Sequence, residues 1–128
     1  MMGVRFDPQR GLVVVHARLW GPNGNAILRL ALDTGATASL LNVGPLVALR
    51  YDPALATDRV QVTTGSSVEF VPRVILDKIQ ALEQERTSFP VLSHTMPPNA
   101  GVDGLLGLDF LRGQRLSVDF RSGEITLA

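Results

Sequence analysis

The amino-acid sequence predicts a mainly β domain, and three observations support this. Branched residues, which suit a pleated sheet, are abundant, because the 128 residues include 14 Val, 4 Ile and 8 Thr. Short apolar runs alternate with Gly, Pro, Asn and Asp, the residues that favour turns. The stretches 59–63 and 67–71 alternate between apolar and polar residues, which is typical of half-buried strands.

Length and composition indicate a single domain over residues 1–128. Domains usually contain about 100–150 residues, and a hydrophobic fraction of 45% argues against intrinsic disorder. Twelve basic residues balance twelve acidic ones, and this zero net charge argues against nucleic acid as the main partner. The absence of cysteine excludes a disulfide framework, a thiolate metal site and a cysteine nucleophile. No apolar run has the length of a membrane span and no secretory signal is present, so we expect a cytoplasmic protein.

The first two strands are expected to form a hairpin. The apolar run Leu12–Trp20 predicts one strand, and Gly21–Asn25 supplies the Pro and Asn-Gly residues of a turn. The run Ala26–Leu32 predicts the returning strand, one face of which is more apolar than the other. This second strand leads directly into Asp33.

The rest of the chain is expected to supply further short strands and one or two short helices. Gly44–Arg50 predicts a helix, because a proline such as Pro45 is tolerated in a first turn. Residues 78–86 are good helix formers, but their neighbours are β, so we favour strands at about 73–80 and 87–93. The remaining strands are expected at Leu40–Asn42, Arg59–Thr63, Ser67–Val71, Leu105–Gly107 (leading into a helix that ends near Arg112), Leu116–Phe120 and Glu124–Leu127.

Asp33 is the strongest candidate for a catalytic group. A carboxylate at the end of an apolar strand is partly desolvated, and Gly35 permits a tight turn that brings backbone N–H groups close to it. Thr34 adds a hydroxyl beside it. Taken alone, an Asp-Thr-Gly triplet is more often an ordinary turn between two strands, so the interpretation depends on the rest of the chain.

The run Leu32–Ala36 resembles the active-site signature of the retroviral-type aspartic proteases, the retropepsins. In that family a flap hairpin follows, and then two apolar residues and a glycine lead into a short helix and a late strand. This chain has the same features in the same order, at Val60–Val71 around Gly65, at Leu105-Leu106-Gly107 before Leu108–Leu111, and at Leu116–Phe120. The resemblance covers roughly residues 12–128 and looks most like the cellular and bacterial branch. It implies an all-β, closed barrel-like fold with one or two short helices.

The resemblance also implies a homodimeric aspartic endopeptidase. The family's active site uses two Asp-Thr-Gly loops and this chain carries one, so two chains would meet and each would give its Asp33. Thr34, Gly35 and Ala36 would support the catalytic loop. Two carboxylates so close share one proton, and the ionised one would activate a water that attacks a peptide bond. No metal and no cofactor is needed.

Two other segments gain roles from the resemblance. Thr63, Thr64, Gly65 and Ser66 would form the tip of a flap that closes over an extended peptide and binds it by strand addition. Leu105, Leu106 and Gly107 would pack beneath the Asp33 loop and have a structural role.

The chain also departs from the viral pattern. Thr37-Ala38-Ser39 stands where viral members have acidic residues, and Leu108 stands where they have an arginine that braces the dimer. The chain continues past Phe120, where a viral chain would end, so its terminal sheet is expected to be built differently. These departures keep open an alternative function, a non-proteolytic dimerisation or peptide-binding module with the same fold.

Overall fold

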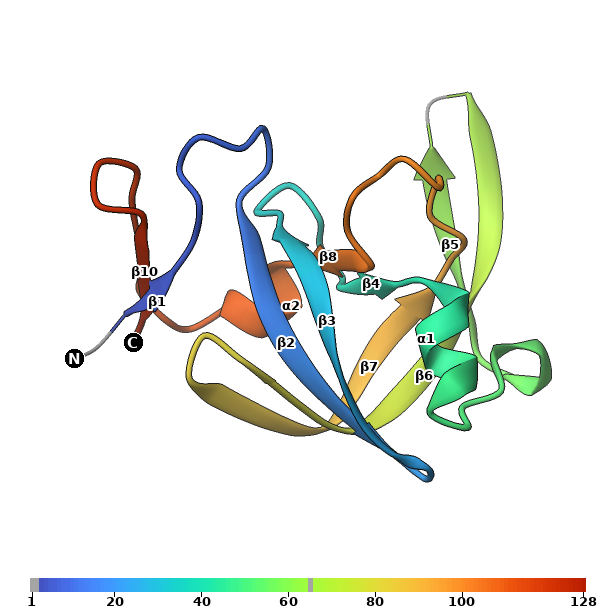
Figure 1. Ribbon diagram of the computed structural model, residues 1–128. Coiled ribbons are helices and arrows are strands. Elements are labelled where there is room, and N and C mark those ends of the chain that lie inside the picture. Colours follow the sequence, from blue (N-terminus) through green and yellow to red (C-terminus); the bar gives the residue numbers. More distant parts are fainter. Residues whose placement is uncertain (1–2, 65) are drawn as a thin grey trace.

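The computed structural model describes residues 3–64 and 66–128, and nearly all of its regular structure is β (Figure 1). The elements are β1 (Val4–Arg5), β2 (Val14–Gly21), β3 (Gly24–Leu32), β4 (Leu40–Leu41), α1 (Val43–Ala48), the 3₁₀ turn η1 (Pro53–Leu55), β5 (Arg59–Thr64), β6 (Ser67–Ala81), β7 (Gln84–Ser93), β8 (Gly104–Leu106), α2 (Leu108–Leu111), β9 (Leu116–Asp119) and β10 (Glu124–Leu127). The predicted all-β class with two short α-helices is confirmed. Among the described residues, no helix has the length and apolar character needed to cross a membrane.

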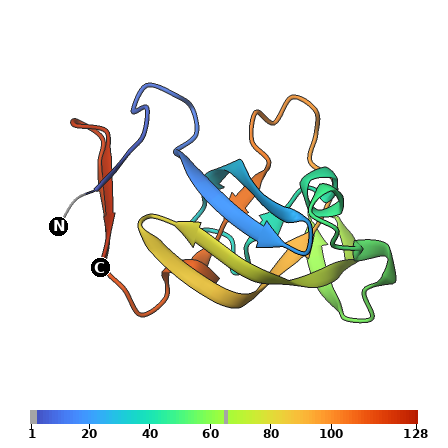
Figure 2. The same cartoon turned by 60° about the horizontal axis from the view of Figure 1, so that its bottom comes forward.

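Six strands close into a barrel. The hydrogen-bonded order is β2-β3-β8-β4-β7-β6, and β2 pairs again with β6, where Leu19 lies opposite Ile79. Closure removes the free edges that an open sheet would expose. The strand β5 continues the sheet beyond β6 and forms with it a hairpin that stands away from the barrel (Figures 1 and 2).

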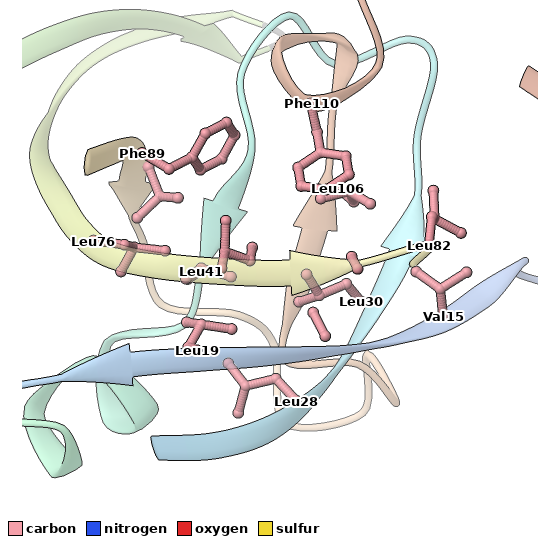
Figure 3. Close-up of a cluster of buried hydrophobic side chains, with 14 of the residues drawn as sticks. Val15, Leu19, Leu28, Leu30, Leu41, Leu76, Leu82, Phe89, Leu106 and Phe110 are labelled. Atoms are coloured by element: carbon pink, nitrogen blue, oxygen red, sulfur yellow. The ribbon is translucent and has the colours of Figure 1, made fainter. Parts of the chain in front are cut away.

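The barrel interior is filled by alternating side chains. On β2, Val15, Ala17 and Leu19 point inward and are completely buried, as the period of two along a strand requires. Leucines of β3, β4, β6 and β8 meet them in one cluster (Figure 3). Phe110 of α2 closes this cluster and packs edge-on against Phe89 of β7, with ring centroids 5.8 Å apart.

The helix-forming stretch 78–86 is a tight hairpin. Strands β6 and β7 pair from Arg73 to Ala81, and Leu82 and Glu83 form the turn with φ of 53° and 63°. Two successive residues with positive φ are typical of a two-residue hairpin turn, which follows the twist of the strands. The favoured strand interpretation is therefore confirmed, although β6 is continuous from 67 to 81 and β7 begins at 84.

Tyr51 fixes the segment after α1 to the barrel. Its hydroxyl donates to the Trp20 carbonyl oxygen at 2.6 Å and accepts the Asp77 N–H at 2.8 Å. Through one side chain, these two bonds join the end of β2 to β6. Burial raises the pKa of Tyr51, so the hydroxyl remains protonated and can donate.

A three-stranded sheet lies beside the barrel and contains both ends of the described chain. Its order is β1-β10-β9, with Val4 opposite Ile125. The β9–β10 hairpin was expected from the sequence, whereas β1 was not. In the turn, the Asp119 carboxylate accepts the N–H groups of Arg121 and Ser122 at 2.8 and 3.1 Å. These backbone bonds, that of Ser122 first, hold the pKa of Asp119 below its usual value.

The pKa shift of Asp119 predicts a pH-dependent stability. A depressed pKa in the folded state stabilises the protein above the pKa of the unfolded chain, about 3.9 for Asp. That stabilisation is lost as the pH falls through the lower folded-state pKa. We therefore expect Asp119→Asn to melt below wild type at pH 7, and the difference in melting temperature to shrink as the pH falls below about 3.9. Melting curves from pH 7 to 2 measure this, and a difference that persists unchanged at pH 2 would contradict it.

Candidate active site

The Asp33 loop crosses the end of a central strand. β3 pairs with β8 in parallel, with Leu32 opposite Leu106, and β4 pairs with β8 on the other side in antiparallel orientation. Residues 33–39 connect β3 to β4, so they must pass over the carboxyl end of β8. The closed barrel thus fixes the loop at both ends and from below.

Gly107 makes this crossing possible. A Cβ atom at this position would lie 2.8 Å from the Ala36 carbonyl oxygen and 2.9 Å from the Ala38 carbonyl group. These are backbone atoms, so no side-chain rotation could relieve the contact. The loop is fastened on both sides of Gly107, because the Asp33 N–H donates to Leu106 O at 2.9 Å and the Leu108 N–H to Ala36 O at 2.8 Å.

A buried polar cluster holds the far end of the loop. Ser39 is completely buried; its hydroxyl donates to Asp109 Oδ1 at 2.7 Å and accepts the Gly107 N–H at 3.0 Å. The Ser39 N–H donates to the other carboxylate oxygen of Asp109 at 2.9 Å. Asp109 lies in the first turn of α2, so this cluster ties the loop to that helix. From the sequence, Ser39 is noted only within the segment that replaces the acidic residues of viral members, and no role is predicted for Asp109.

The Asp33 carboxylate lies in a tight turn and is half-buried. Its Oδ1 accepts the Gly35 N–H at 2.9 Å, and its carbonyl oxygen accepts the Ala36 N–H at 3.2 Å. Thr34 and Gly35 at the tip of the turn are exposed. A carboxylate held this way keeps oxygen lone pairs for a water or a second acid, which is the requirement for general acid–base work.

A further acidic residue near this region, Asp103, is engaged elsewhere. Asp103, which precedes β8, accepts the Arg29 N–H at 2.9 Å through Oδ2 and donates its own N–H to Arg29 O. It therefore fastens β3 and offers no second Asp-Thr-Gly loop. In the part of the chain that the structure describes, no group of three or more acidic or histidine side chains could hold a metal ion.

The predicted flap is the tip of the β5–β6 hairpin, apart from the Asp33 loop in sequence and in space (Figure 1). Thr63 lies opposite Val68 near this tip, and Ser66 is exposed. Gly65 and the Thr64 side chain lie outside the described part. Nearer the barrel, Glu69 of β6 contacts His94, which follows β7, with Oε2 and Nε2 3.0 Å apart. This hydrogen-bonded contact joins the hairpin to the segment before β8.

A hollow of about 360 Å³ opens beside the exposed Thr34. It is lined mainly by residues of α2 and of the segment that follows it, namely Leu108, Leu111, Arg112, Gly113, Gln114 and Leu116. Leu108 is the residue that replaces the arginine of the viral pattern. The surface next to the Asp33 turn is therefore largely apolar rather than ionic.

Comparison with known proteins places the chain in a family. Residues 22–113 match the family model described as "gag-polyprotein putative aspartyl protease". This segment contains the Asp33 turn, the β5–β6 hairpin and β8. Among curated protein sequences, none matches the chain at a significant level.

Two solved structures with the same fold come from a bacterium and a protozoan. A retropepsin-like aspartic protease from Rickettsia conorii aligns with a TM-score of 0.72 at 15% identity, over 98% of this chain and 89% of that one. The retroviral protease-like domain of Ddi1 from Leishmania major aligns with a TM-score of 0.58 at 13% identity, over 94% and 92%. The likeness therefore covers nearly the whole barrel and the terminal sheet. With its Asp-Thr-Gly turn, its glycine crossing and its matching family model, the chain belongs to the gag-polyprotein aspartyl protease family and has the retropepsin-like fold.

Proposed function

We propose that this protein is an aspartic endopeptidase and that its active site forms from two copies of the chain. The observation that carries the proposal is the Asp33 turn, held from beneath by Leu106 and Gly107 and open to solvent at Thr34. One chain supplies one such carboxylate. A second copy related by a two-fold axis would supply the other.

Two Asp33 carboxylates brought together would share a proton, because two like charges in contact cannot both remain ionised. The ionised partner would take a proton from a bound water. The protonated partner would hydrogen-bond the scissile carbonyl oxygen and then pass a proton to the leaving amine. Water forms the new C–O bond as the C–N bond breaks, so this route needs no covalent intermediate with the enzyme.

The apolar hollow beside Thr34 supports contact with a second copy at this face. Leu108 and Leu116 line it, and Thr34 stands at its border. In this arrangement, apolar contacts between the two chains would replace the contacts by which an arginine is expected to brace the dimer in viral members. The β5–β6 hairpin, with Phe70 65% exposed, would act as the flap and cover an extended peptide.

A non-proteolytic peptide-binding module is the second candidate. The observation that favours it is Leu108 in place of the viral arginine, because a leucine cannot form the ionic bracing of the catalytic pair that the arginine would provide. The two candidates differ in one measurable property, peptide cleavage.

Replacing Asp33 by Asn tests the catalytic role directly. The side chain is nearly isosteric and can still accept the Gly35 N–H, but it cannot take a proton from water. We expect peptide cleavage to fall at least about a thousandfold, while the fold and the association state persist. Digests of a peptide library between pH 3 and 7 measure this, with the exposed Asp52→Asn as the matched control. Activity retained in Asp33→Asn would remove Asp33 from catalysis, and a wild type that binds but never cleaves peptides would favour the module.

Association of two chains is a separate expectation. We expect sedimentation to give twice the 13.8 kDa of one chain at micromolar concentration. Leu108→Glu would place a carboxylate in the apolar contact and shift the protein to monomers with loss of cleavage. Leu55→Glu, at the end of η1 where the side chain is already 76% exposed, is the control and should change neither the association state nor cleavage. A monomer at every concentration that still cleaves peptides would contradict the shared site.

The Ser39 hydroxyl is expected to stabilise the loop that carries Asp33. Ser39→Ala leaves the Gly107 N–H and one Asp109 oxygen without their buried partner, which we expect to cost about 1–3 kcal/mol of unfolding free energy. Ser117→Ala, on the exposed face of β9, should cost less than about 0.5 kcal/mol. Urea unfolding of the two variants measures this difference. Equal stability of the two would mean that the polar cluster around Ser39 does not hold the loop.

A further inference from the structure

A basic hollow lies on the outer side of the β2–β3 hairpin, next to the segment that joins β1 to β2. Its volume is about 340 Å³, and three arginines and a histidine take part in its lining, which consists of Arg5, Phe6, Asp7, Arg10, Val14, His16 and Arg29. The three arginines are separated in the sequence, so no run of basic residues indicates that they lie together. Folding brings them together because β1 joins the terminal sheet and the following loop returns to β2 (Figure 1).

The guanidinium of Arg29 has no acceptor among the described residues. The residue is half-buried on β3, and its Nη2 atom is shielded from solvent without a hydrogen-bond partner. Asp103 is bonded to the backbone of Arg29 and forms no ion pair with its side chain. A partly desolvated charge without a partner is unfavourable, and a bound anion would offset that cost.

The charges around Arg29 also favour an anion. Three arginines and one aspartate give the hollow a net charge of +2, with His16 counted as neutral, in a chain whose total net charge is zero. The carboxylate of Asp7 is already engaged, because it accepts the Gln9 N–H at 2.9 Å. His16 lies directly opposite Arg29 in the β2–β3 register and is exposed, so a ring nitrogen is available as a further donor.

We propose that this hollow binds a phosphate-type dianion, between Arg29, Arg10 and Arg5. A guanidinium presents a planar fork of donors that matches two oxygens of a tetrahedral oxyanion. Arg5 Nη2 already donates to the Ser122 carbonyl oxygen at 3.2 Å, so Arg5 would contribute its other N–H groups. A phosphate offers enough acceptor oxygens for several forks and a charge that balances +2, whereas a carboxylate offers two oxygens and one charge. The site faces the outer side of β3 and does not involve the Asp33 carboxylate, so it is independent of the proposed peptidase activity. The phosphate could be free or part of a phosphomonoester, and the chemistry is the same.

Calorimetric titration of the full chain with inorganic phosphate tests the site, with phosphoserine as the phosphomonoester and sodium chloride at matched ionic strength as the blank. We expect saturable binding of one phosphate per chain with a millimolar or lower Kd. Arg29→Gln should weaken it at least about tenfold, because a charge-assisted hydrogen bond is lost. Arg10→Gln, in an exposed loop where folding does not depend on the side chain, should weaken it several-fold. Arg50→Gln, exposed after α1 on the far side of the barrel, should leave the Kd unchanged.

Both sources of phosphate can be distinguished in the same experiment. Equal affinities for inorganic phosphate and phosphoserine would identify the phosphate group alone as the ligand, and tighter binding of phosphoserine would indicate a larger phosphorylated molecule. Heat that does not saturate, or an effect equal to that of chloride, would overturn the proposal. An equal loss of affinity in Arg50→Gln and Arg29→Gln would also overturn it, because binding would then follow the overall charge rather than this hollow.

Discussion

The passage of the Asp33 loop over the end of β8 is the constraint on which the rest of the site depends. β3 and β4 flank β8, so the chain between them has one route, and the missing side chain of Gly107 leaves room for it. The loop then acquires its shape from bonds that the crossing makes possible, those of Asp33 to Leu106 and of Leu108 to Ala36. The strand order of the barrel therefore determines the path of the loop, and the path of the loop determines where the Asp33 carboxylate lies.

The strands and the candidate catalytic loop could be predicted from the sequence because their signals are local. Alternation, turn residues and the triplet at Asp33 lie within a few positions of one another. The helix propensity of residues 78–86 pointed the other way, but burial of Ile79 and Ala81 in the barrel seam decided the outcome. In this segment, packing between strands that are distant in the sequence outweighs the local helix propensity.

The parts that escaped prediction depend on partners far apart in the chain. β1 is only two residues long and exists because β10, about 120 positions later, pairs with it. The Ser39–Asp109 bond joins residues 70 positions apart, and a serine six residues after Asp33 carries no signal that it will be buried. The basic hollow is of the same kind, since Arg5, Arg10 and Arg29 are unremarkable until the terminal sheet forms. Features of this kind can be recognised only once it is known which distant segments the fold brings together.

The strand β6 runs without a break from the projecting hairpin into the barrel, so its pairing in one part affects its pairing in the other. The same strand forms one side of the projecting hairpin near Ser67 and closes the barrel against β2 near Ala81. A shift of one residue along the barrel part of β6 would turn buried side chains such as Ile79 and Ala81 outward, so the barrel core fixes the register of this part of the strand. Under the proposed function, this fixed register would set how far apart along a bound extended peptide the hairpin and the Asp33 turn make their contacts.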